Sequence, residues 1–360
     1  MDLEAIGKVK NRFDEPEDIK EMRESESQII VDENYIEGLD GLDKGDFLKV
    51  VFYFHESNDY ELKGKRREGK VRGVFASRSP HRPSQIGVTT VQLMEKDENV
   101  LKVYGLDAMN GTPILDIKPY SSWLDEPTGL KNLDNPRQYI NTLVEKEKYD
   151  SILAKAGELH GHYCPNLSLG VIGGSYAMKK LKQTSIGMED VIAIIETNNC
   201  FSDGIQYSTG CTFGNNSLIY RDYGKTAFTL IERKNQESIR LYFKQNDFLE
   251  KEYPETQELF QKVIVEKNGD KKDSKKLTKK WKQIAYDFTK KQPTNLFKIE
   301  KNPQIDKIPK KAPIYEDKYC DKCDEKVMAT RIIKKEQTQY CIPCADETYI
   351  QLDGRGMIQK

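Results

Sequence analysis

Short apolar runs separated by Gly, Pro, Asp or Asn dominate the first third of the chain. These runs are rich in Val, Ile, Phe and Tyr, and they predict strands at residues 7–10, 47–55, 71–77, 88–94 and 100–105. The acidic segment at residues 15–26 predicts a helix or a loop. Many short strands at close spacing are typical of a closed or nearly closed barrel, so we expect an all-β barrel over residues 1–122.

The pattern becomes more helical after this region. Residues 123–150 carry mixed charge and predict a linker that enters a helix at residues 138–156. The run of small and apolar residues at 167–181 predicts a buried helix, and its three glycines permit close packing against a neighbour. A nucleotide-binding loop is an alternative for these glycines, but no strand precedes them at the required spacing.

The next segment alternates between strands and short helical stretches. Residues 191–196 predict a fully apolar strand that leads into a short helix. The pair Asn215 and Asn216 predicts the turn of a hairpin between residues 217–222 and 226–232. Together with the buried helix, these elements predict a central α+β domain over residues 151–265.

A lysine-rich segment occupies residues 266–313. Ser274 is the predicted cap of an amphipathic helix, and the prolines from residue 293 onward predict an extended connector. Lysines opposite the apolar stripe are typical of a solvated face. They also permit an RNA-facing surface in which Trp281 and Tyr286 stack on bases. The predicted apolar stripe consists of Leu277, Trp281, Ile284, Ala285 and Phe288.

Composition narrows the functional classes. The chain has 360 residues, 32% of them charged, with a net charge of −1, so the protein as a whole is not a polycation built for nucleic acid. It has no long uncharged apolar run, and its first residues lack the basic start and apolar core of a signal peptide. We therefore expect a soluble, cytoplasmic protein with no membrane partner.

The seven cysteines and four histidines carry the strongest chemical signal. An odd number of cysteines in metal-type spacings argues against a disulfide framework. His160, His162 and Cys164 lie within five residues, and Pro165 follows where a helix can begin. Imidazole and thiolate ligands favour zinc, copper or iron over magnesium.

Two further cysteines, Cys200 and Cys211, are candidate ligands of the same central metal, because each lies at the end of a predicted element. With His160 or His162 and Cys164 they complete a tetrahedral zinc set. Three protein ligands and an open position are the catalytic alternative, with Asp203 orienting a ligand. The cysteines as small buried apolar residues are a third reading.

The final segment, residues 314–360, contains two Cys-x-x-Cys motifs separated by seventeen residues. This spacing predicts a zinc ribbon with a structural zinc ion, and a redox dithiol is the alternative. So small a module cannot build an adequate core alone, so a closed metal site should stabilise it. The predicted ligands are Cys320, Cys323, Cys341 and Cys344.

Two phrases in the first domain, at residues 72–87 and 105–120, closely resemble the tRNA-methyltransferase O family, also called TsaA-like or VirR-like. The resemblance implies a β-barrel that binds S-adenosylmethionine, with the cofactor near the interface of a homodimer. The family pattern Arg-Pro-Asn-Pro-Ile-Gly is changed here at Ser84 and Gln85. The residues that the resemblance assigns to cofactor binding are Arg78, Arg82, Pro83, Ile86, Gly87, Asp107, Gly111, Thr112 and Lys118.

Methyl transfer requires mainly that two partners are positioned and that one proton is accepted. Asp116 and Tyr120 are the candidate catalytic residues, because either side chain is able to accept or relay a proton. The alternative reading is that Arg78 and Arg82 are surface charges and Asp116 caps a turn.

The central region resembles the FmdE family, whose name comes from formylmethanofuran dehydrogenase. The matching phrases occur in the family's order at residues 159–165, 196–200, 203–206, 209–214 and 221–225. The resemblance implies a metal held by histidine and cysteine, a second transition metal that we expect to be zinc. It also implies an archaeal setting related to methanogenesis.

Two functions follow as hypotheses. The first is an S-adenosylmethionine-dependent methyltransferase, with the N6 position of a tRNA adenosine as default substrate, coupled to the His/Cys metal site. The alternative is a metal-binding accessory protein of archaeal one-carbon or molybdenum/tungsten enzyme metabolism. The expected partners are a second copy of the chain, tRNA, and a formylmethanofuran dehydrogenase-type complex. A methyl acceptor that is a thiol or a metal-bound ligand would connect the two sites.

Overall fold

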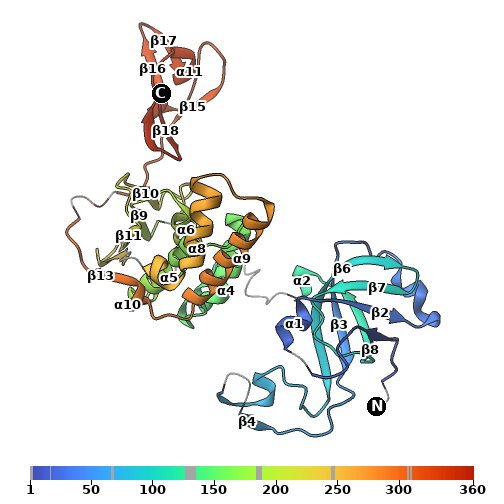
Figure 1. Cartoon of the computed structure of the whole chain (residues 1–360). Helices are drawn as coiled ribbons and strands as arrows, with labels where there is room; N and C mark the ends of the chain where they lie inside the picture. Colours follow the sequence, from blue (N-terminus) through green and yellow to red (C-terminus); the bar gives the residue numbers. More distant parts are fainter. Residues whose placement is uncertain are drawn as a thin grey trace. The chain divides into compact units, whose positions relative to one another are not determined.

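The computed structural model describes residues 3–16, 18–65, 69–125, 135–183, 189–244, 248–305, 308 and 310–360. The chain divides into two compact units, Met1–Pro127 and Thr128–Lys360 (Figure 1). In the described ranges, no helix has the length and apolar character needed to cross a membrane.

The first unit is a closed six-stranded barrel, which confirms the predicted all-β fold. Every neighbouring pair of strands is antiparallel, and β1 closes the barrel against β8. Alternate residues of β2 and β3 point inward, and Ile29 and Leu48 are fully buried. In barrel order the strands are β1 Gly7–Lys10, β2 Glu26–Val31, β7 Val100–Tyr104, β6 Ile86–Asp97, β3 Phe47–Tyr53 and β8 Pro113–Pro119.

Outside the barrel strands, the described part of this unit contains short helices, a small hairpin and 3-10 segments. A short helix, α1 Ile19–Arg23, occupies the acidic segment, as expected. The predicted strand at residues 71–77 is wrong as a barrel strand, because only β5 Val71–Gly73 is extended and it pairs with β4 Lys63–Lys65 outside the barrel. A 3-10 turn at Val74–Ala76 ends it. Another 3-10 segment, Glu33–Leu39, links β2 to β3.

The second unit contains a five-stranded sheet in the order β10-β9-β11-β12-β13. The predicted hairpin at Asn215 and Asn216 is wrong, because β9 lies between β10 and β11 and pairs with both. All five residues of β9 are buried, as expected of a central strand that is covered on both faces. The strands are β10 Leu218–Tyr220, β9 Val191–Ile195, β11 Ala227–Glu232, β12 Ser238–Phe243 and β13 Phe297–Lys301.

Helices cover one face of this sheet (Figure 1). The predicted helix at residues 138–156 is two helices, because Glu147 adopts a left-handed conformation with φ of 53°. The predicted buried helix is confirmed as α5, with twelve buried residues. The helices are α3 Gln138–Glu145, α4 Tyr149–His160, α5 Pro165–Lys180 and α6 Cys200–Thr209, and a short α2, Ser122–Asp125, precedes them in the first unit.

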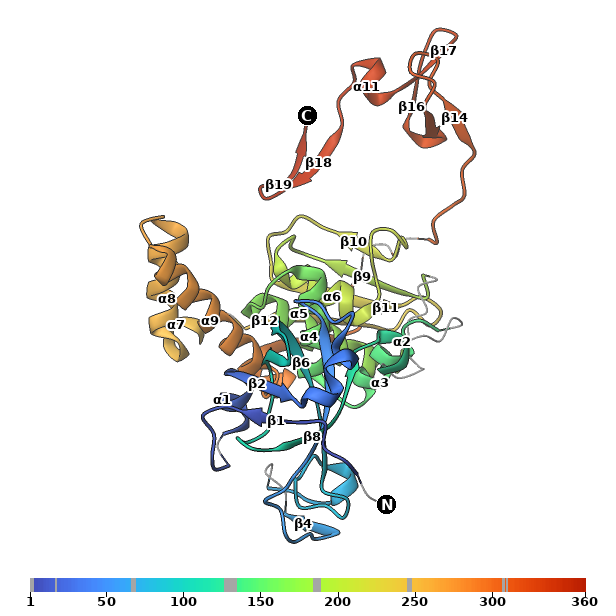
Figure 2. The ribbon, with the colours of Figure 1, turned by 90° about the vertical axis from the view of Figure 1, so that its right-hand side faces the viewer.

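Helices α8 and α9 pack side by side, and α9 also packs on α5 (Figure 2). The predicted stripe of α9 is confirmed, since Leu277, Ile284, Ala285 and Phe288 are buried. The predicted cap is wrong: Asp270 and Asp273 form a reciprocal capping box, and the Ser274 hydroxyl donates to the Asp270 carbonyl. The segment comprises α7 Phe248–Glu252, α8 Pro254–Phe260, a π-helical turn Gln261–Val265, α9 Lys271–Phe288 and α10 Pro293–Leu296.

The C-terminal segment consists of three antiparallel hairpins and one short helix. Among its described residues, Cys320, Cys341, Ala345 and Gly356 are buried, so it has almost no apolar core. Its elements are β14 Asp317–Tyr319, β15 Lys326–Met328, a 3-10 turn Ala329–Arg331, β16 Ile332–Lys335, β17 Thr338–Cys341, α11 Ile342–Ala345, β18 Ile350–Asp353 and β19 Gly356–Gln359.

Candidate functional site

The central ligand group consists of His160, His162, Cys164 and Cys200, whose ligand atoms all lie within 4.8 Å of one another. His160 is the last residue of α4, which ends because Gly161 adopts a left-handed conformation. Cys164 is the N-cap of α5, and Cys200 is the first residue of α6. Three helix ends therefore supply three ligands, and His162 lies in the short connection between α4 and α5.

The imidazole of His160 is held by a carboxylate. Its Nδ1 atom lies 2.7 Å from Asp203 Oδ2, and the Gln206 amide donates to the other oxygen of Asp203 at 3.1 Å. An ionised carboxylate only accepts, so the proton is on Nδ1 and the lone pair of Nε2 is available. Nε2 is buried and has no hydrogen-bond partner within the described part of the chain. This is the arrangement expected of a metal-ligating histidine.

The two thiols influence each other strongly. A hydrogen bond with Cys164, together with the neighbouring imidazoles, lowers the pKa of Cys200 to about 5 against the opposing effect of burial. The same hydrogen bond, together with burial, raises the pKa of Cys164. One thiolate is thus already favoured at neutral pH, and a bound cation would stabilise both. Two thiolates and two imidazoles fit tetrahedral zinc.

An aromatic cavity of about 320 Å³ opens beside this group. Trp281 lies with its ring centroid 6.3 Å from that of His162, and Phe260 packs at the same distance on Trp281. The cavity also contains polar groups at Asn166, Thr256 and Gln257. A small organic molecule in this cavity would therefore lie between the metal ligands and the side chains of α8 and α9. Sequence reasoning placed Trp281 in the apolar stripe of a lysine-rich helix or, as the alternative, on an RNA-facing surface, and nothing local indicates its position beside the metal ligands.

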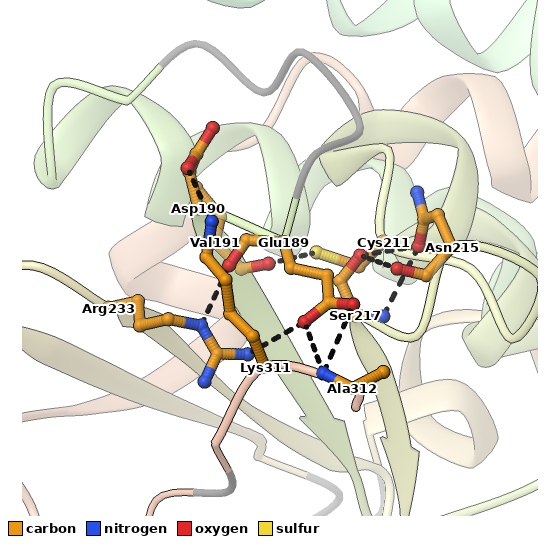
Figure 3. A network of polar contacts seen from close by, with 9 residues as sticks. All are labelled: Glu189, Asp190, Val191, Cys211, Asn215, Ser217, Arg233, Lys311 and Ala312. Atoms are coloured by element: carbon orange, nitrogen blue, oxygen red, sulfur yellow. Dashed lines mark hydrogen bonds and ion pairs between the residues drawn. The ribbon is translucent and has the colours of Figure 1, made fainter. Parts of the chain in front are cut away.

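The structure does not bring Cys211 to the central ligand group. Cys211 follows the C-terminus of α6, whereas Cys200 begins it, and ten helical residues span about 15 Å. Figure 3 shows its thiol directed at Val191, whose carbonyl it meets at 3.5 Å. Burial raises the pKa of this thiol to about 11. Cys211 is thus a neutral core residue in this structure.

The four C-terminal cysteines form a second ligand group, with all their sulfur atoms within 4.8 Å. The sulfurs of Cys323 and Cys341 lie 3.9 Å apart, which joins the two Cys-x-x-Cys motifs. Four thiolates at this separation fit a closed structural zinc site.

The barrel has a cavity of its own, of about 390 Å³. Three of the residues assigned to cofactor binding, Arg78, Asp107 and Thr112, line it. Asp107 Oδ1 is buried and lacks a hydrogen-bond partner among the described residues. A buried carboxylate oxygen without a partner is costly, so a donor on a ligand would satisfy it. Sequence reasoning did not assign Phe54, His55, Ser57 and His81, which also line this barrel cavity.

The other residues that the sequence assigned to cofactor binding lie in the loops and strands of the barrel. The Arg82 guanidinium donates to the Val74 and Ser77 carbonyls at 3.2 and 3.0 Å, which holds the loop around it. A Cβ atom at Gly87 would lie 2.3 Å from the Phe52 ring, so only glycine fits there. Gly111 has φ of 77° and begins the turn into β8. Pro83 and Ile86 flank the turn that leads into β6.

Ser84 and Gln85, where the chain differs from the family pattern, form a hydrogen-bonded turn. Gln85 adopts φ of 48°, and its backbone carbonyl accepts from Phe54 N at 2.8 Å. Its side chain accepts from the Tyr53 hydroxyl and donates to the Ser57 carbonyl. Gln85 therefore ties the end of β3 to the loop that carries Ser57 at the barrel cavity.

Of the candidate catalytic residues, Asp116 lies on β8 and Tyr120 directly follows this strand. Asp116 pairs in register with Val51, and its carboxylate forms an ion pair with Lys118 at 2.5 Å. Tyr120 N donates to the Phe47 carbonyl at the far end of β3. The barrel cavity includes none of Asp116, Lys118 and Tyr120.

Fold and sites together define a multidomain protein that joins a ligand-binding β-barrel to a His/Cys metal-ligand domain and a four-cysteine module. Residues 6–126 match the model of the tRNA-methyltransferase O N-terminal domain, and residues 159–298 match the model named FmdE, molybdenum formylmethanofuran dehydrogenase operon.

A probable S-adenosyl-L-methionine-binding protein of Archaeoglobus fulgidus is 39% identical over 338 residues, which covers 92% of this chain and 88% of the relative. The chain therefore belongs to the family of this archaeal protein. Human tRNA (adenine(37)-N6)-methyltransferase is 36% identical over 122 residues, covering 31% of this chain and 28% of that enzyme. A solved FmdE-like protein of the tungsten formylmethanofuran dehydrogenase type, from Syntrophus aciditrophicus, is 21% identical, with a TM-score of 0.37, covering 55% of this chain and 91% of that one.

A matched pair of cysteine variants tests the ligand set. We expect the full chain to bind two zinc ions, one in each ligand group. Cys200→Ser should reduce this to one, because it removes a thiolate from the central ligand group, whereas Cys211→Ser should retain both. Elemental analysis of the purified proteins measures the ratio. Loss of one zinc from the Cys211→Ser protein would contradict the ligand set.

Proposed function

We propose that this protein is an S-adenosylmethionine-dependent methyltransferase that binds its cofactor in the barrel cavity. The observation that carries this proposal is Asp107, whose buried oxygen, unpartnered among the described residues, lies in a cavity of about 390 Å³. The cofactor offers amino groups to a carboxylate and its own carboxylate to an arginine. Asp107 and Arg78 have the charges to bind these groups.

The bound cofactor would supply an electrophilic methyl group on a sulfonium. The barrel has to orient that group and exclude competing water, and Phe52 and Phe54 provide apolar walls for this purpose. Gln85 supports the same wall from behind through Tyr53 and Ser57.

The proposed acceptor is the N6 atom of a tRNA adenosine. The human relative is named for this reaction, which supports the substrate class. Mass spectrometry of tRNA nucleosides from a strain that lacks this protein tests it. An unchanged level of N6-methylated adenosine derivatives would exclude this acceptor.

Asp116 and Tyr120 are the proposed proton acceptors, with Lys118 beside them. Because they lie outside the barrel cavity of their own chain, this role requires a homodimer in which each barrel presents them to its partner's cofactor. Lys118 fits the role, because its ion pair holds the Asp116 carboxylate in one orientation.

The central metal is proposed to act on the acceptor side of the same reaction or in a separate one. Asp203 orients His160, and the aromatic cavity admits a small molecule beside Cys164 and Cys200. This open access favours the alternative function as well, a metal-binding accessory protein of a formylmethanofuran dehydrogenase-type complex. Under that alternative, the metal-ligand domain binds the partner enzyme and the barrel only binds a ligand.

Binding of the cofactor to the barrel cavity can be measured directly. Calorimetry should detect S-adenosylmethionine binding to the full chain, and Asp107→Ala should weaken it about tenfold or more, because a charge-assisted hydrogen bond is lost. Asp97→Ala, at the exposed end of β6, is the matched control and should bind normally. Equal affinity of both variants would argue against the barrel cavity as the site.

Mixing two inactive proteins tests the shared site. At an S-adenosylmethionine concentration far below the Kd of Asp107→Ala, this variant and Asp116→Ala should each show little methyl transfer. An equal mixture that exchanges subunits should recover about a quarter of the parent activity, because half of the dimers regain one intact site. Asp107→Ala mixed with Arg78→Ala should stay inactive, since both residues belong to one cavity. A mixture of the first pair that stays inactive despite exchange would contradict the dimeric site.

Coupling between the two sites can be measured on the Cys200→Ser protein. If the central metal acts in the methyl transfer, this protein should bind S-adenosylmethionine normally and lose turnover. Full turnover, together with lost copurification of a formylmethanofuran dehydrogenase-type enzyme, would favour the accessory function instead.

A further inference from the structure

A second cavity of about 250 Å³ lies on the metal-ligand domain, away from the central ligand group. Ile194, Glu196 and Thr229 line it. Successive residues of a strand point to opposite faces, and Ala193 and Ile195 belong to the helix-covered core while Ile192 and Ile194 form a separate cluster. The cavity and the metal ligands therefore lie on opposite faces of the sheet.

The charges in this cavity are unbalanced. Arg240 donates to both oxygens of Glu196, at 2.7 and 2.9 Å, and Glu196 is 7% exposed, so these two charges neutralise each other. Arg221 and Lys225 also line the cavity. Neither forms an ion pair within the described part of the chain, and Lys225 Nζ only approaches the Tyr223 ring at 5.9 Å. Arg221 and Lys225 therefore remain without an ion pair from the described residues, while Glu300, opposite Arg240 in the β12–β13 register, adds a carboxylate near Arg240.

In the loop between β10 and β11, the basic residues line the cavity and the acidic residue between them has other partners. Arg221, Tyr223 and Lys225 line the cavity, whereas Asp222 between them is bonded elsewhere. The Asp222 carboxylate accepts from the Tyr220 hydroxyl at 2.6 Å and from the backbone N–H of Met357, in the C-terminal hairpin, at 2.8 Å. The acid that would neutralise the cations is thus held by other donors.

We propose that this basic cavity, lined by Arg221, Lys225, Arg240 and Thr229, binds a phosphate monoester. A monoester carries nearly two negative charges at neutral pH, which matches the two cations left over. A guanidinium binds phosphate oxygens through paired N–H groups, an ammonium adds a point charge, and the Thr229 hydroxyl is a further donor. This site is independent of methyl transfer and of both metal groups.

Calorimetry of the full zinc-loaded chain tests the proposal, with inorganic phosphate and glycerol 3-phosphate as probes and glycerol as the uncharged control. We expect one saturable site per chain for both phosphates and none for glycerol. The double variant Arg221→Gln/Lys225→Gln should bind about tenfold more weakly or worse, because both charged donors are lost. Lys234→Gln, an exposed lysine in the turn after β11, should bind like the parent protein.

The double variant should fold normally, since the replaced side chains form no ion pair with any described residue, and equal thermal unfolding by circular dichroism verifies this. An RNA oligonucleotide without a terminal phosphate contains only phosphodiesters, so its binding distinguishes a diester ligand from a monoester ligand. Saturable binding of that RNA without binding of glycerol 3-phosphate would overturn the monoester assignment. Absent binding of both phosphates, or equal binding by the parent and the double variant, would overturn the site.

Discussion

The close parallel packing of α5 and α6 is the contact on which the central ligand group depends. A Cβ atom at Gly170 would lie 2.1 Å from the Phe201 carbonyl oxygen, and one at Gly204 would lie 2.4 Å from that of Leu167. Four residues further along, Gly174 meets Ser208 in the same way. The helices therefore run in the same direction, and their N-termini lie together. Cys164 and Cys200 begin these two helices, where the helix dipoles favour thiolates.

The sheet behind these helices gives the domain two chemically different faces. Side chains from β9 alternate, so residues of one parity join the large core with the metal ligands, while Ile192 and Ile194 face the other way. Glu196 follows on that second face and engages Arg240, and only four residues later Cys200 enters the ligand group. The segment that follows β9 thus contributes to both sites, and the sheet separates the thiolate ligands on one face from the basic cavity on the other.

The sequence predicted those site residues whose geometry is local. His160, His162 and Cys164 are neighbours in the chain, and the two Cys-x-x-Cys motifs have a fixed reach, so spacing alone indicated their chemistry. Cys211 was assigned from its position at an element's end, and only the length of α6 separates it from Cys200. The positions of Phe260 and Trp281 beside the ligands could not be predicted, because they depend on the docking of α8 and α9, which begin more than fifty residues after Cys200.

The difference between local and long-range interactions also explains which strands the sequence did not predict. β2 and β8 were missed as separate strands because polar or charged residues interrupt them, such as Ser27 and Asp116. Their strand state comes from pairing with distant partners, β7 for one and β3 for the other. At the N-terminus of α9, Ser274 was the plausible cap by type, but Asp270 with Asp273 satisfies more of the first N–H groups.

The two metal-ligand groups differ in how much the apolar core around each of them stabilises the fold. The ribbon has almost no apolar core around Cys320 and Cys341, so a cation held by four thiolates would supply much of its folding free energy. The central ligand group lies at the edge of a core that includes Ile152, Leu167 and Phe201, all fully buried. Burial of this apolar core supplies a stabilisation that the ribbon lacks, so the domain depends less on a cation for its folding free energy. Since the group also opens to the aromatic cavity, its ligands are placed for chemistry or binding rather than for stability.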